Sequence, residues 1–334
     1  MSILVVGSVA LDSVETPFGK VRDVLGGSAV YFSTAASYFA DINMVAVVGS
    51  DFPENHIDFL KSRNIDIKGL QREKGNTFRW EGRYGFELNE AHTLNTQLNV
   101  FEGFNPKIPE GYKNSEYVFL ANIDPELQLD VLRQVKNPTL VACDTMNFWI
   151  EKKPKELQKT IEKVDVLIIN EAEARGFTCE PNLVKAAKRI LSMGPKTLIV
   201  KRGEYGALMF TGSSIFHAPA YPLENIFDPT GAGDSFAGGF IGYLANTRNL
   251  EDGNIRQAVV FGSVMASFNV EDFSLNRLKD LTYPDMEYRY REFKKFTHFE
   301  DICRDAVIQK GFVFLCSSLL LSSSSMDVPR TKRF

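Results

Sequence analysis

The sequence predicts an α/β protein whose central sheet is mainly parallel and carries helices on both faces, with a small second β element beside it. Two observations support this prediction. From about residue 116 onward, short apolar runs alternate with helical patterns, which favours parallel strands joined by crossover helices. Between residues 76 and 100, polar residues instead alternate with aromatic ones at a period of two, which is typical of a half-buried sheet edge.

The expected elements follow in chain order. Residues 3–6 form a first buried strand and not a signal peptide, because no basic segment accompanies the apolar run. Residues 13–25 alternate around Pro17 to Gly19 as a hairpin does, and Gly26-Gly27-Ser28 opens a helix that runs to residue 40. Further buried strands are expected at residues 43–48, 117–120, 140–143, 166–169 and 198–200, and further helices at residues 53–63, 125–136, 155–163, 183–193, 254–269 and 281–299.

Composition limits the class of protein. With 334 residues and a hydrophobic content of 44%, the chain is long enough for one large domain with an accessory element. The net charge is −4 and the body of the chain has no basic block, so binding to nucleic acid or to an anionic membrane has no electrostatic support. The cysteines show neither a C-x-x-C spacing nor a disulfide framework, which suits a reducing compartment, and we expect the protein in the cytoplasm.

The chain is organised around residues 227–243, Phe-Asp-Pro-Thr-Gly-Ala-Gly-Asp-Ser-Phe-Ala-Gly-Gly-Phe-Ile-Gly-Tyr. Small residues from Gly231 to Gly233 form a turn, and an apolar stripe at helical spacing follows from Phe236 onward. Unpaired amides and the positive end of the helix dipole make such a corner an anion site. Asp234 would repel a phosphate there unless it acts on another group, such as an alcohol that attacks a γ-phosphate. For a bare G-A-G-D a capped glycine-rich helix would be the favoured interpretation; the whole string from Asp228 to Phe236 favours the anion site.

The string from Asp228 to Gly239 resembles the second signature of the ribokinase/PfkB family of carbohydrate and nucleoside kinases. The resemblance implies a three-layer ribokinase-like fold over residues 1–300 with a small β-sheet lid. It also implies an ATP-dependent kinase that uses Mg²⁺ and phosphorylates the hydroxymethyl group of a sugar or nucleoside. By the same resemblance, Asp234 is the catalytic base and the anion hole is formed by Gly231, Ala232 and Gly233.

The resemblance extends to the acceptor side, with one departure. Asp12 matches an aspartate that takes substrate hydroxyls, although an ordinary turn residue would look the same, and Gly26 and Gly27 match a hinge and substrate loop. Four residues after the second glycine the family usually has an asparagine that binds sugar hydroxyls, and this chain has Tyr31. A ribose- or fructose-like mode of binding is therefore not implied.

We expect a lid made of residues 13–25 and 72–100. Phe78, Trp80 and Tyr84 fall on one face of its second part. A solvated hairpin does not explain three aromatic residues on one face, whereas a covered ligand or a homodimer contact does. Together with Tyr31, two of them, Phe78 and Trp80, hint at a stacked nucleoside base, although a sugar also stacks its C–H face on aromatic rings.

Ligands of a parallel sheet bind at the carboxyl ends of the strands. The polar residues expected at this edge are Asn122, Asp124, Asp144, Asn147, Asn170, Glu173 and Lys201. The resemblance assigns Asn170 and Glu173, an N-x-x-E motif, to the network around Mg²⁺, and it assigns Asp228 to a monovalent cation such as K⁺. It places Lys201, Gly203 and Gly206 beside the nucleotide phosphates. On the residues alone, N-x-x-E is equally a helix start with an acidic first turn.

The leading hypothesis is an ATP-dependent sugar or nucleoside kinase with a small-molecule acceptor. The alternative is a non-catalytic sensor of sugars or nucleotides on the same fold. Neither the P-loop motif nor G-x-S-x-G occurs in the chain, so a P-loop NTPase and a hydrolase rank low. The apolar part of residues 301–334 is far shorter than the ~20 residues of a membrane span, and we expect a poorly ordered or aberrant tail.

Overall fold

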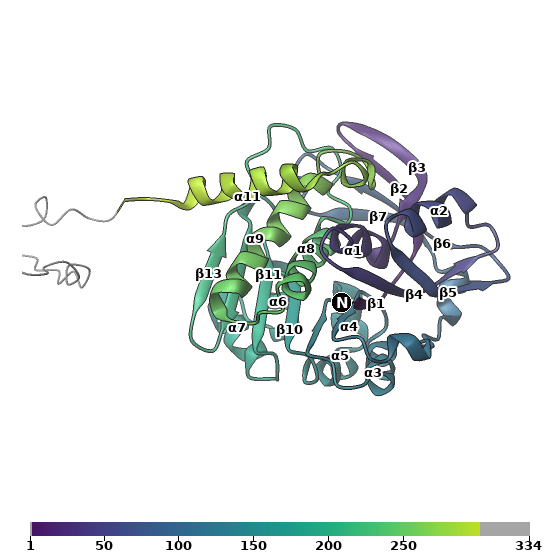
Figure 1. Ribbon diagram of the computed structural model, residues 1–334, viewed down its shortest axis with the longest axis horizontal. Coiled ribbons are helices and arrows are strands. Elements are labelled where there is room, and N and C mark those ends of the chain that lie inside the picture. The colour runs from purple at the N-terminus through teal and green to yellow at the C-terminus, as the bar shows by residue number, and fades with distance from the viewer. Residues whose placement is uncertain (1, 301–334) are drawn as a thin grey trace, which may run out of the picture. The chain divides into compact units, whose positions relative to one another are not determined.

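The computed structural model describes residues 2–300 (Figure 1). Contacts divide the chain into a first unit, residues 1–295, and a second unit, residues 296–334, and the fold described here belongs to the first. The tail expected at residues 301–334 lies outside the described residues.

The central strands of the main sheet consist of residues buried on both faces, and the strands at its two edges are partly exposed. Its members are β1 (Ser2–Val6), β4 (Asp41–Gly49), β5 (Ile65–Glu73), β8 (Tyr117–Leu120), β9 (Leu140–Cys143), β10 (Val166–Asn170), β11 (Thr197–Lys201), β12 (Ala207–Thr211) and β13 (Ile215–Ala218). Within residues 2–300, these nine strands pair in the order β13-β12-β11-β10-β9-β8-β1-β4-β5. The strands from β11 to β5 are parallel, and β12 and β13 continue the sheet antiparallel. The predicted mainly parallel sheet is therefore confirmed.

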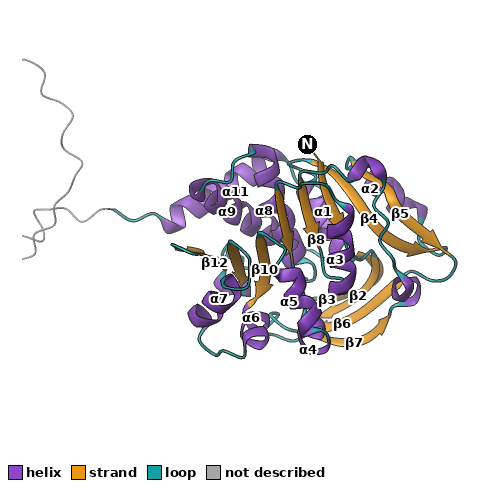
Figure 2. Cartoon of the chain, turned by 90° about the horizontal axis from the view of Figure 1, so that it is seen from below, coloured by secondary structure: helices purple, strands orange, loops and turns teal. Residues whose placement is uncertain are grey.

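Helices cover both faces of this sheet. They are α1 (Ser28–Ala36), α2 (Glu54–Ser62), α3 (Pro125–Gln134), α4 (Asn147–Lys152), α5 (Pro154–Ile161), α6 (Glu171–Thr178), α7 (Leu183–Leu191), α8 (Ala232–Thr247), α9 (Asp252–Asn269), α10 (Asn276–Lys279) and α11 (Tyr283–Thr297). Figure 2 shows α1, α8 and α9 on one side of the sheet and α3 and α5 on the other. Ile3 and Val5 of β1 join the core under the first group, whereas Leu4 and Val6 join the core under the second. Alternate residues of a strand point to opposite faces, so an unbroken apolar strand needs two covering layers.

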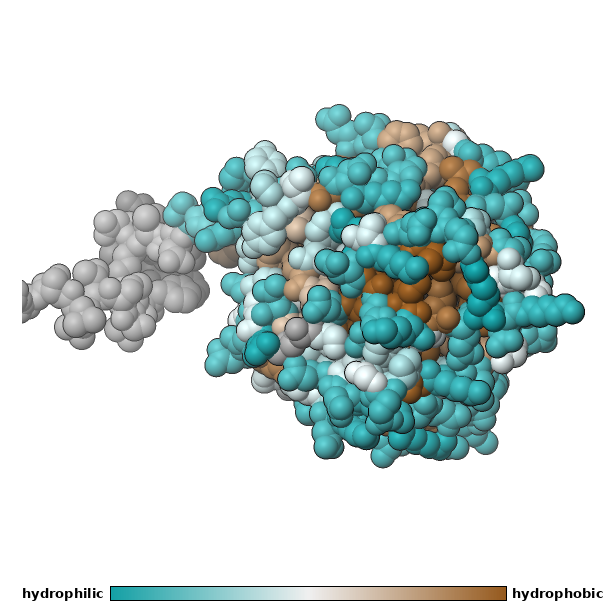
Figure 3. Space-filling model, turned by 45° about the vertical axis from the view of Figure 1, so that its right-hand side comes forward, coloured by the Kyte–Doolittle hydropathy of each residue, from teal (hydrophilic) through white to brown (hydrophobic). Residues whose placement is uncertain are grey.

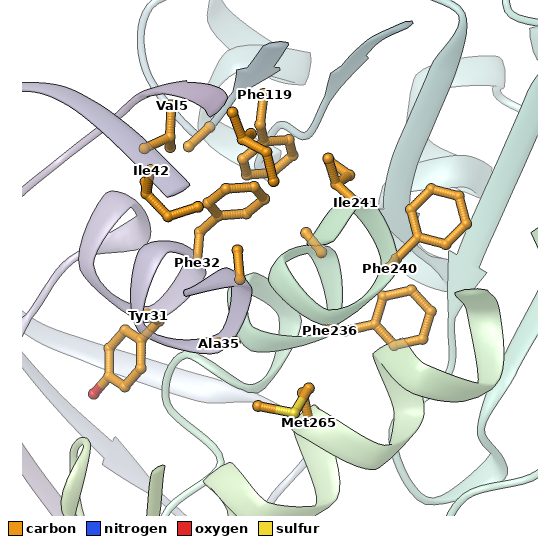
Figure 4. Close-up of a cluster of buried hydrophobic side chains, with 14 of the residues drawn as sticks. Val5, Tyr31, Phe32, Ala35, Ile42, Phe119, Phe236, Phe240, Ile241 and Met265 are labelled. Atoms are coloured by element: carbon orange, nitrogen blue, oxygen red, sulfur yellow. The ribbon is translucent and has the colours of Figure 1, made fainter. Parts of the chain in front are cut away.

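The helices α1 and α8 are packed closely against each other and against the sheet (Figure 4). Phe32 of α1 stacks on Phe119 of β8 with ring centroids 4.3 Å apart. At Gly238 of α8 a Cβ would collide with the backbone oxygen of Phe32, so the glycine permits this close approach. Because both helices are held rigidly by the core, the loops that open them are fixed in position.

The small second sheet confirms the predicted lid and changes its limits. It consists of β3 (Gly19–Gly26), β2 (Ala10–Thr16), β6 (Phe78–Tyr84) and β7 (Ala91–Gln97), paired in that order. The lid therefore starts at Ala10, earlier than expected. Its second part starts at Phe78 and not at residue 72, because β5 keeps residues 65–73 in the main sheet.

Other differences concern short elements. The helix after Gly27 ends at Ala36 and gives way to turns, not at residue 40. The strands β5, β12 and β13 were not expected. Of these, β5 and β13 form the two edges of the sheet, and edge strands carry weaker apolar patterns than central ones. Among the described residues no helix is long and apolar enough to cross a lipid bilayer. Hydrophilic residues cover most of the face seen in Figure 3, and apolar residues gather in one area near its middle.

Candidate active site

The glycine corner has the local geometry that its sequence predicts, a left-handed turn that opens directly into a helix. Gly231 adopts a left-handed conformation, φ 74°, and no side chain caps α8. The first intrahelical bond is the one that Ser235 N–H donates to the Gly231 carbonyl, at 2.8 Å. The Ala232 amide donates instead to the Pro229 carbonyl, at 3.1 Å. The amides of Gly233 and Asp234 lie in the first turn of α8, where no preceding helical carbonyl can accept them, whereas the Ala232 amide is used within the turn.

Buried side chains fix the conformation of the glycine corner through hydrogen bonds. The fully buried Asp228 accepts hydrogen bonds from the amides of Thr230, at 2.9 Å, and Ser274, at 3.1 Å, one on each carboxylate oxygen. Asn269 of α9 donates to the Thr230 carbonyl at 2.7 Å and accepts from Ser235 Oγ at 3.0 Å. The loop geometry is thus set by hydrogen bonds from distant elements.

A cluster of charges surrounds Asp234 at the carboxyl edge of the sheet. Lys201 ends β11, and its ammonium lies so close to the corner that a Cβ at Gly233 would be 2.6 Å from Nζ. Asp144 follows β9 and Glu173 lies in the first turn of α6, and both are buried. One lysine therefore faces three carboxyl groups, beside amides that attract an anion.

Burial sets the proton affinity of these groups. Burial raises the pKa of Asp234 to about 6, and the Lys201 ammonium opposes the shift. Burial raises the pKa of Asp144 well above its usual range, and the nearby Asp234 charge adds to the effect. The pKa of Glu173 is also raised by burial, again with Lys201 opposing. A carboxyl group with a pKa near neutrality is suited to accept a proton during a reaction.

The predicted residues Asp12, Gly26 and Gly27 lie together where the lid joins the main domain. Asp12 of β2 is 4% exposed, and its carboxylate accepts the Gly27 amide. The same carboxylate lies directly against Gly26, where a Cβ would overlap it. Burial raises the pKa of Asp12 to about 7, and the charges of Asp228 and Asp234 contribute. The structure thus brings the predicted residues Asp12, Gly26 and Gly27 to the same site as Asp234.

The lid spans the site from the acceptor side to the turn after β11. Thr230 Oγ1 of the corner is 3.3 Å from the hydroxyl of Tyr84, at the end of β6. At the tip of the hairpin formed by β6 and β7, Asn89 lies against Gly203, where a Cβ would collide with its side chain. The lid is therefore closed over the edge of the main sheet in this structure.

The turn from Lys201 to Gly206 is tightly formed. Gly203 and Gly206 have φ values of 55° and 80°, and the Arg202 amide donates to the Gly206 carbonyl at 2.8 Å. Arg202 Nε also donates to Glu171 Oε2 at 2.6 Å, which joins this turn to the start of α6.

A comparison with families of known proteins agrees with this geometry. The model of the pfkB family of carbohydrate kinases matches residues 2–280. The chain belongs to this family. It is a pfkB-family kinase, which confirms the resemblance seen in its second signature.

Relatives of this pfkB-family kinase include nucleoside and sugar kinases. A cytidine kinase of Thermococcus kodakarensis is 30% identical over 257 residues, covering 75% of this chain and 91% of that protein. A nucleoside kinase of Methanocaldococcus jannaschii is 28% identical over 269 residues, covering 78% and 82%. A ribokinase of Bacillus subtilis is 26% identical over 293 residues, covering 81% and 94%.

Solved structures confirm the ribokinase-like fold of the kinase. The crystal structure of the Methanocaldococcus jannaschii nucleoside kinase, a member of the ribokinase family, has a TM-score of 0.71 at 23% identity and covers 87% of this chain and 98% of that one. A Burkholderia thailandensis nucleoside kinase in complex with inosine has a TM-score of 0.70 at 16% identity, with coverages of 87% and 98%.

Not every polar residue expected at the sheet edge of the kinase points to the site. Asp124 caps α3 and pairs with Lys153 at 2.7 Å, and Asn122 accepts from Trp149 Nε1 at 3.0 Å. Asn147 is exposed at the start of α4. These side chains support local structure.

Asn170 and Glu173 form a reciprocal capping box. The Glu173 amide donates to Asn170 Oδ1, and the Asn170 amide donates to Glu173 Oε2, both at 2.8 Å. The helix-start interpretation of N-x-x-E is therefore correct for these contacts, and Glu173 also faces Lys201 and Asp234. Asp144 was expected at this edge from its position after a strand, but no motif distinguished it from its neighbours there, and the structure places it with Asp234, Lys201 and Glu173.

The aromatic residues that hinted at base stacking have partners within the protein. Phe78 stacks on Phe101 with centroids 5.2 Å apart. The Trp80 ring lies over Gly82, and its Nε1 donates to Thr93 Oγ1 at 3.2 Å. The Tyr31 ring packs on Gly231. Because these contacts already account for the positions of the three rings, the rings by themselves do not indicate a stacked nucleoside base.

Proposed function

We propose that this kinase transfers the γ-phosphoryl group of ATP to the hydroxymethyl group of a nucleoside or of a ribose-type sugar. One observation carries the proposal: Asp234 stands beside the free amides of α8 and the Lys201 ammonium, opposite the lid and the buried Asp12. The names of the relatives, cytidine kinase, nucleoside kinase and ribokinase, support the acceptor class.

The chemistry follows from the position of these groups. The amides of Gly233 and Asp234 bind the γ-phosphate, and Lys201 neutralises charge that develops on it. The acceptor oxygen forms a bond to the γ-phosphorus as the bond to the β–γ bridging oxygen breaks, and ADP leaves with that electron pair. Asp234 accepts the proton of the acceptor hydroxyl. The lid keeps water from replacing the acceptor.

The residues near Asp234 fit a magnesium ion. Asp144 Oδ1 is buried without a hydrogen-bond partner among the described residues. No group of three or more His, Cys, Asp or Glu side chains within residues 2–300 would hold a metal by itself. Mg²⁺ typically uses one or two carboxylates together with water and substrate phosphates, so Asp144 and Glu173 would hold it here. When bound, the ion supplies positive charge that stabilises the transferring phosphates.

Asp228 fits a monovalent cation less well. Each of its oxygens already accepts an amide, so its carboxylate holds the corner in place. We assign Asp228 to the structure of the loop and derive no step through K⁺.

The test of the proposed function is release of ADP. Purified protein with ATP and Mg²⁺ is incubated with cytidine, adenosine, inosine, ribose, fructose or fructose 6-phosphate, and a coupled assay follows ADP, with ATP alone as the control. We expect acceptor-dependent ADP release that is fastest with a nucleoside or ribose, and a product phosphorylated on its hydroxymethyl group. Binding of an acceptor without any ADP release would contradict the proposal and favour the sensor.

We also propose that two copies associate through the lid. Phe86, in the turn between β6 and β7, is 92% exposed, and Leu94 of β7 is 49% exposed. Light scattering is expected to give a dimer for the wild type and a monomer for Phe86→Ser, with Val184→Ser on α7 as the surface control. A monomeric wild type would exclude this association.

A further inference from the structure

Tyr31 occupies an unusual place beside the catalytic corner. It lies in the first turn of α1 and is 1% exposed. Its ring is flush against Gly231, because a Cβ on that glycine would overlap the ring atoms. Figure 4 shows the ring pointing away from Phe32 and the apolar cluster, with the hydroxyl at its far end. The ring thus supports the corner, and the hydroxyl extends past it.

The Tyr31 hydroxyl is buried and has no hydrogen-bond partner among the residues that the structure describes. The neighbouring phenol differs, since the Tyr84 hydroxyl meets Thr230 Oγ1 at 3.3 Å. The charged groups that act on Tyr31 are Asp12 first, then Asp228 and Asp234, and together with burial they raise its pKa. Asp228 is occupied by two amides, and Asp234 is the weakest of the charges on Tyr31 and the proposed base, which leaves Asp12 as the carboxylate beside the hydroxyl that can bind a further ligand group.

A buried hydroxyl without a partner is costly, and such a group in a native protein calls for an explanation, of which a functional role beside a reaction site is one. The missing partner has to accept a hydrogen bond from the Tyr31 hydroxyl. It also has to donate one, because the Asp12 carboxylate beside it can only accept. A hydroxyl group meets both demands, because it accepts and donates at the same time. An amine or a methylene meets at most one of them.

We propose that Tyr31 determines acceptor specificity: its hydroxyl donates a hydrogen bond to a ring hydroxyl of the substrate's sugar, and this substrate hydroxyl donates to Asp12. The inference rests on the proposed function and narrows it to acceptors that carry this hydroxyl, at the expense of their deoxy analogues. A site built around a substrate hydroxyl rejects an analogue that lacks it, because the buried polar groups then stay unpaired.

The test removes the proposed hydrogen bond between Tyr31 and the substrate in two ways, by a substitution in the protein and by a deoxy analogue of the substrate. The acceptor with the highest kcat/KM among cytidine, adenosine, inosine and ribose is compared with its 2- and 3-deoxy forms, in the wild type and in Tyr31→Phe. The phenylalanine keeps the ring that supports Gly231. Tyr38→Phe is the matched control, because Tyr38 follows the same helix and its hydroxyl already donates to the Leu278 carbonyl, at 2.6 Å. Thermal melting of all three proteins without ligand separates stability from recognition.

In Tyr31→Phe we expect KM for the full acceptor to rise about three- to tenfold, with kcat and the KM for ATP nearly unchanged. For one of the two deoxy forms, KM is expected to be the same in Tyr31→Phe as in the wild type. The preference for the full acceptor over that deoxy form is therefore expected to be smaller in Tyr31→Phe. The melting temperature is not expected to fall, because an unpaired group is removed, whereas Tyr38→Phe should melt lower with an unchanged preference.

An active wild type whose preference is the same in Tyr31→Phe would overturn this inference and leave the proposed function intact. The inference also fails if KM rises equally for the full and the deoxy acceptors, since that is the sign of a structural role. A wild type that releases no ADP with any of the four acceptors would overturn the proposed function, and this inference with it.

Discussion

Asp234→Asn is expected to lower kcat by about 10²–10⁴-fold while binding of ATP stays nearly unchanged. The amide keeps the shape of the side chain and the free backbone amides of the corner, so the phosphate site survives. It removes the group that accepts the acceptor's proton. Steady-state kinetics gives kcat, and calorimetric titration with ATP gives the affinity.

The matched control for this change is Asp130→Asn. Asp130 is a half-exposed residue of α3 that forms an ion pair with Arg133. It is far from the glycine corner in sequence and has no part in the proposed reaction. It undergoes the same chemical change and should keep kcat near the wild-type value. Near-normal turnover in Asp234→Asn would remove Asp234 from the mechanism.

The pH dependence of turnover depends on the same residue. Asp234 accepts a proton only as a carboxylate, and its pKa lies at about 6, above the usual 3.8 because of burial. Turnover is therefore expected to fall as the pH drops through about 6, where the carboxylate becomes protonated. The residual activity of Asp234→Asn should lack this acid limb, because its amide does not titrate.

Asp144→Asn is expected to have two opposite effects. In catalysis it should raise the Mg²⁺ concentration needed for half-maximal activity by about 10–100-fold, because a carboxylate near the ion is lost. In the ligand-free protein it should raise the free energy of unfolding by on the order of 1–3 kcal/mol at neutral pH, because a buried carboxyl group beside Asp234 and Glu173, whose Oδ1 has no hydrogen-bond partner among the described residues, is replaced by a neutral one.

The sign of the stability effect can be checked with pH. The folded state holds the Asp144 proton more tightly than the unfolded state, where the pKa is near 3.8. The cost of Asp144 is therefore absent well below pH 4 and grows as the pH rises toward neutrality. Denaturant unfolding at pH 4 and pH 7.5 should show the gain from Asp144→Asn only at the higher pH. Equal Mg²⁺ dependence in mutant and wild type would contradict the metal assignment.

Several features of this kinase could be predicted from local sequence. Apolar runs such as residues 166–169 are long enough to specify a strand buried on both faces, and they alternate with amphipathic segments that cover it. The corner from Asp228 to Asp234 is equally local, because a left-handed glycine followed by a helix start defines its shape within a few residues.

Other features depend on groups far apart in the chain. Asn89, in the turn between β6 and β7 of the lid, meets Gly203, in the turn between β11 and β12 of the main sheet, although the two residues are far apart in sequence. The pKa of Asp144 depends on burial and on the charges of Asp234, Glu173 and Lys201, none of which is near it in sequence.

Periodicity and backbone preferences within short segments were enough to specify the layered α/β fold, the lid and the glycine corner with its aspartate. The packing of distant segments sets which carboxyl groups are desolvated together, and it leaves the Tyr31 hydroxyl without a partner among the described residues. Burial and charge interactions are sums over neighbours from the whole chain, and no local pattern records them.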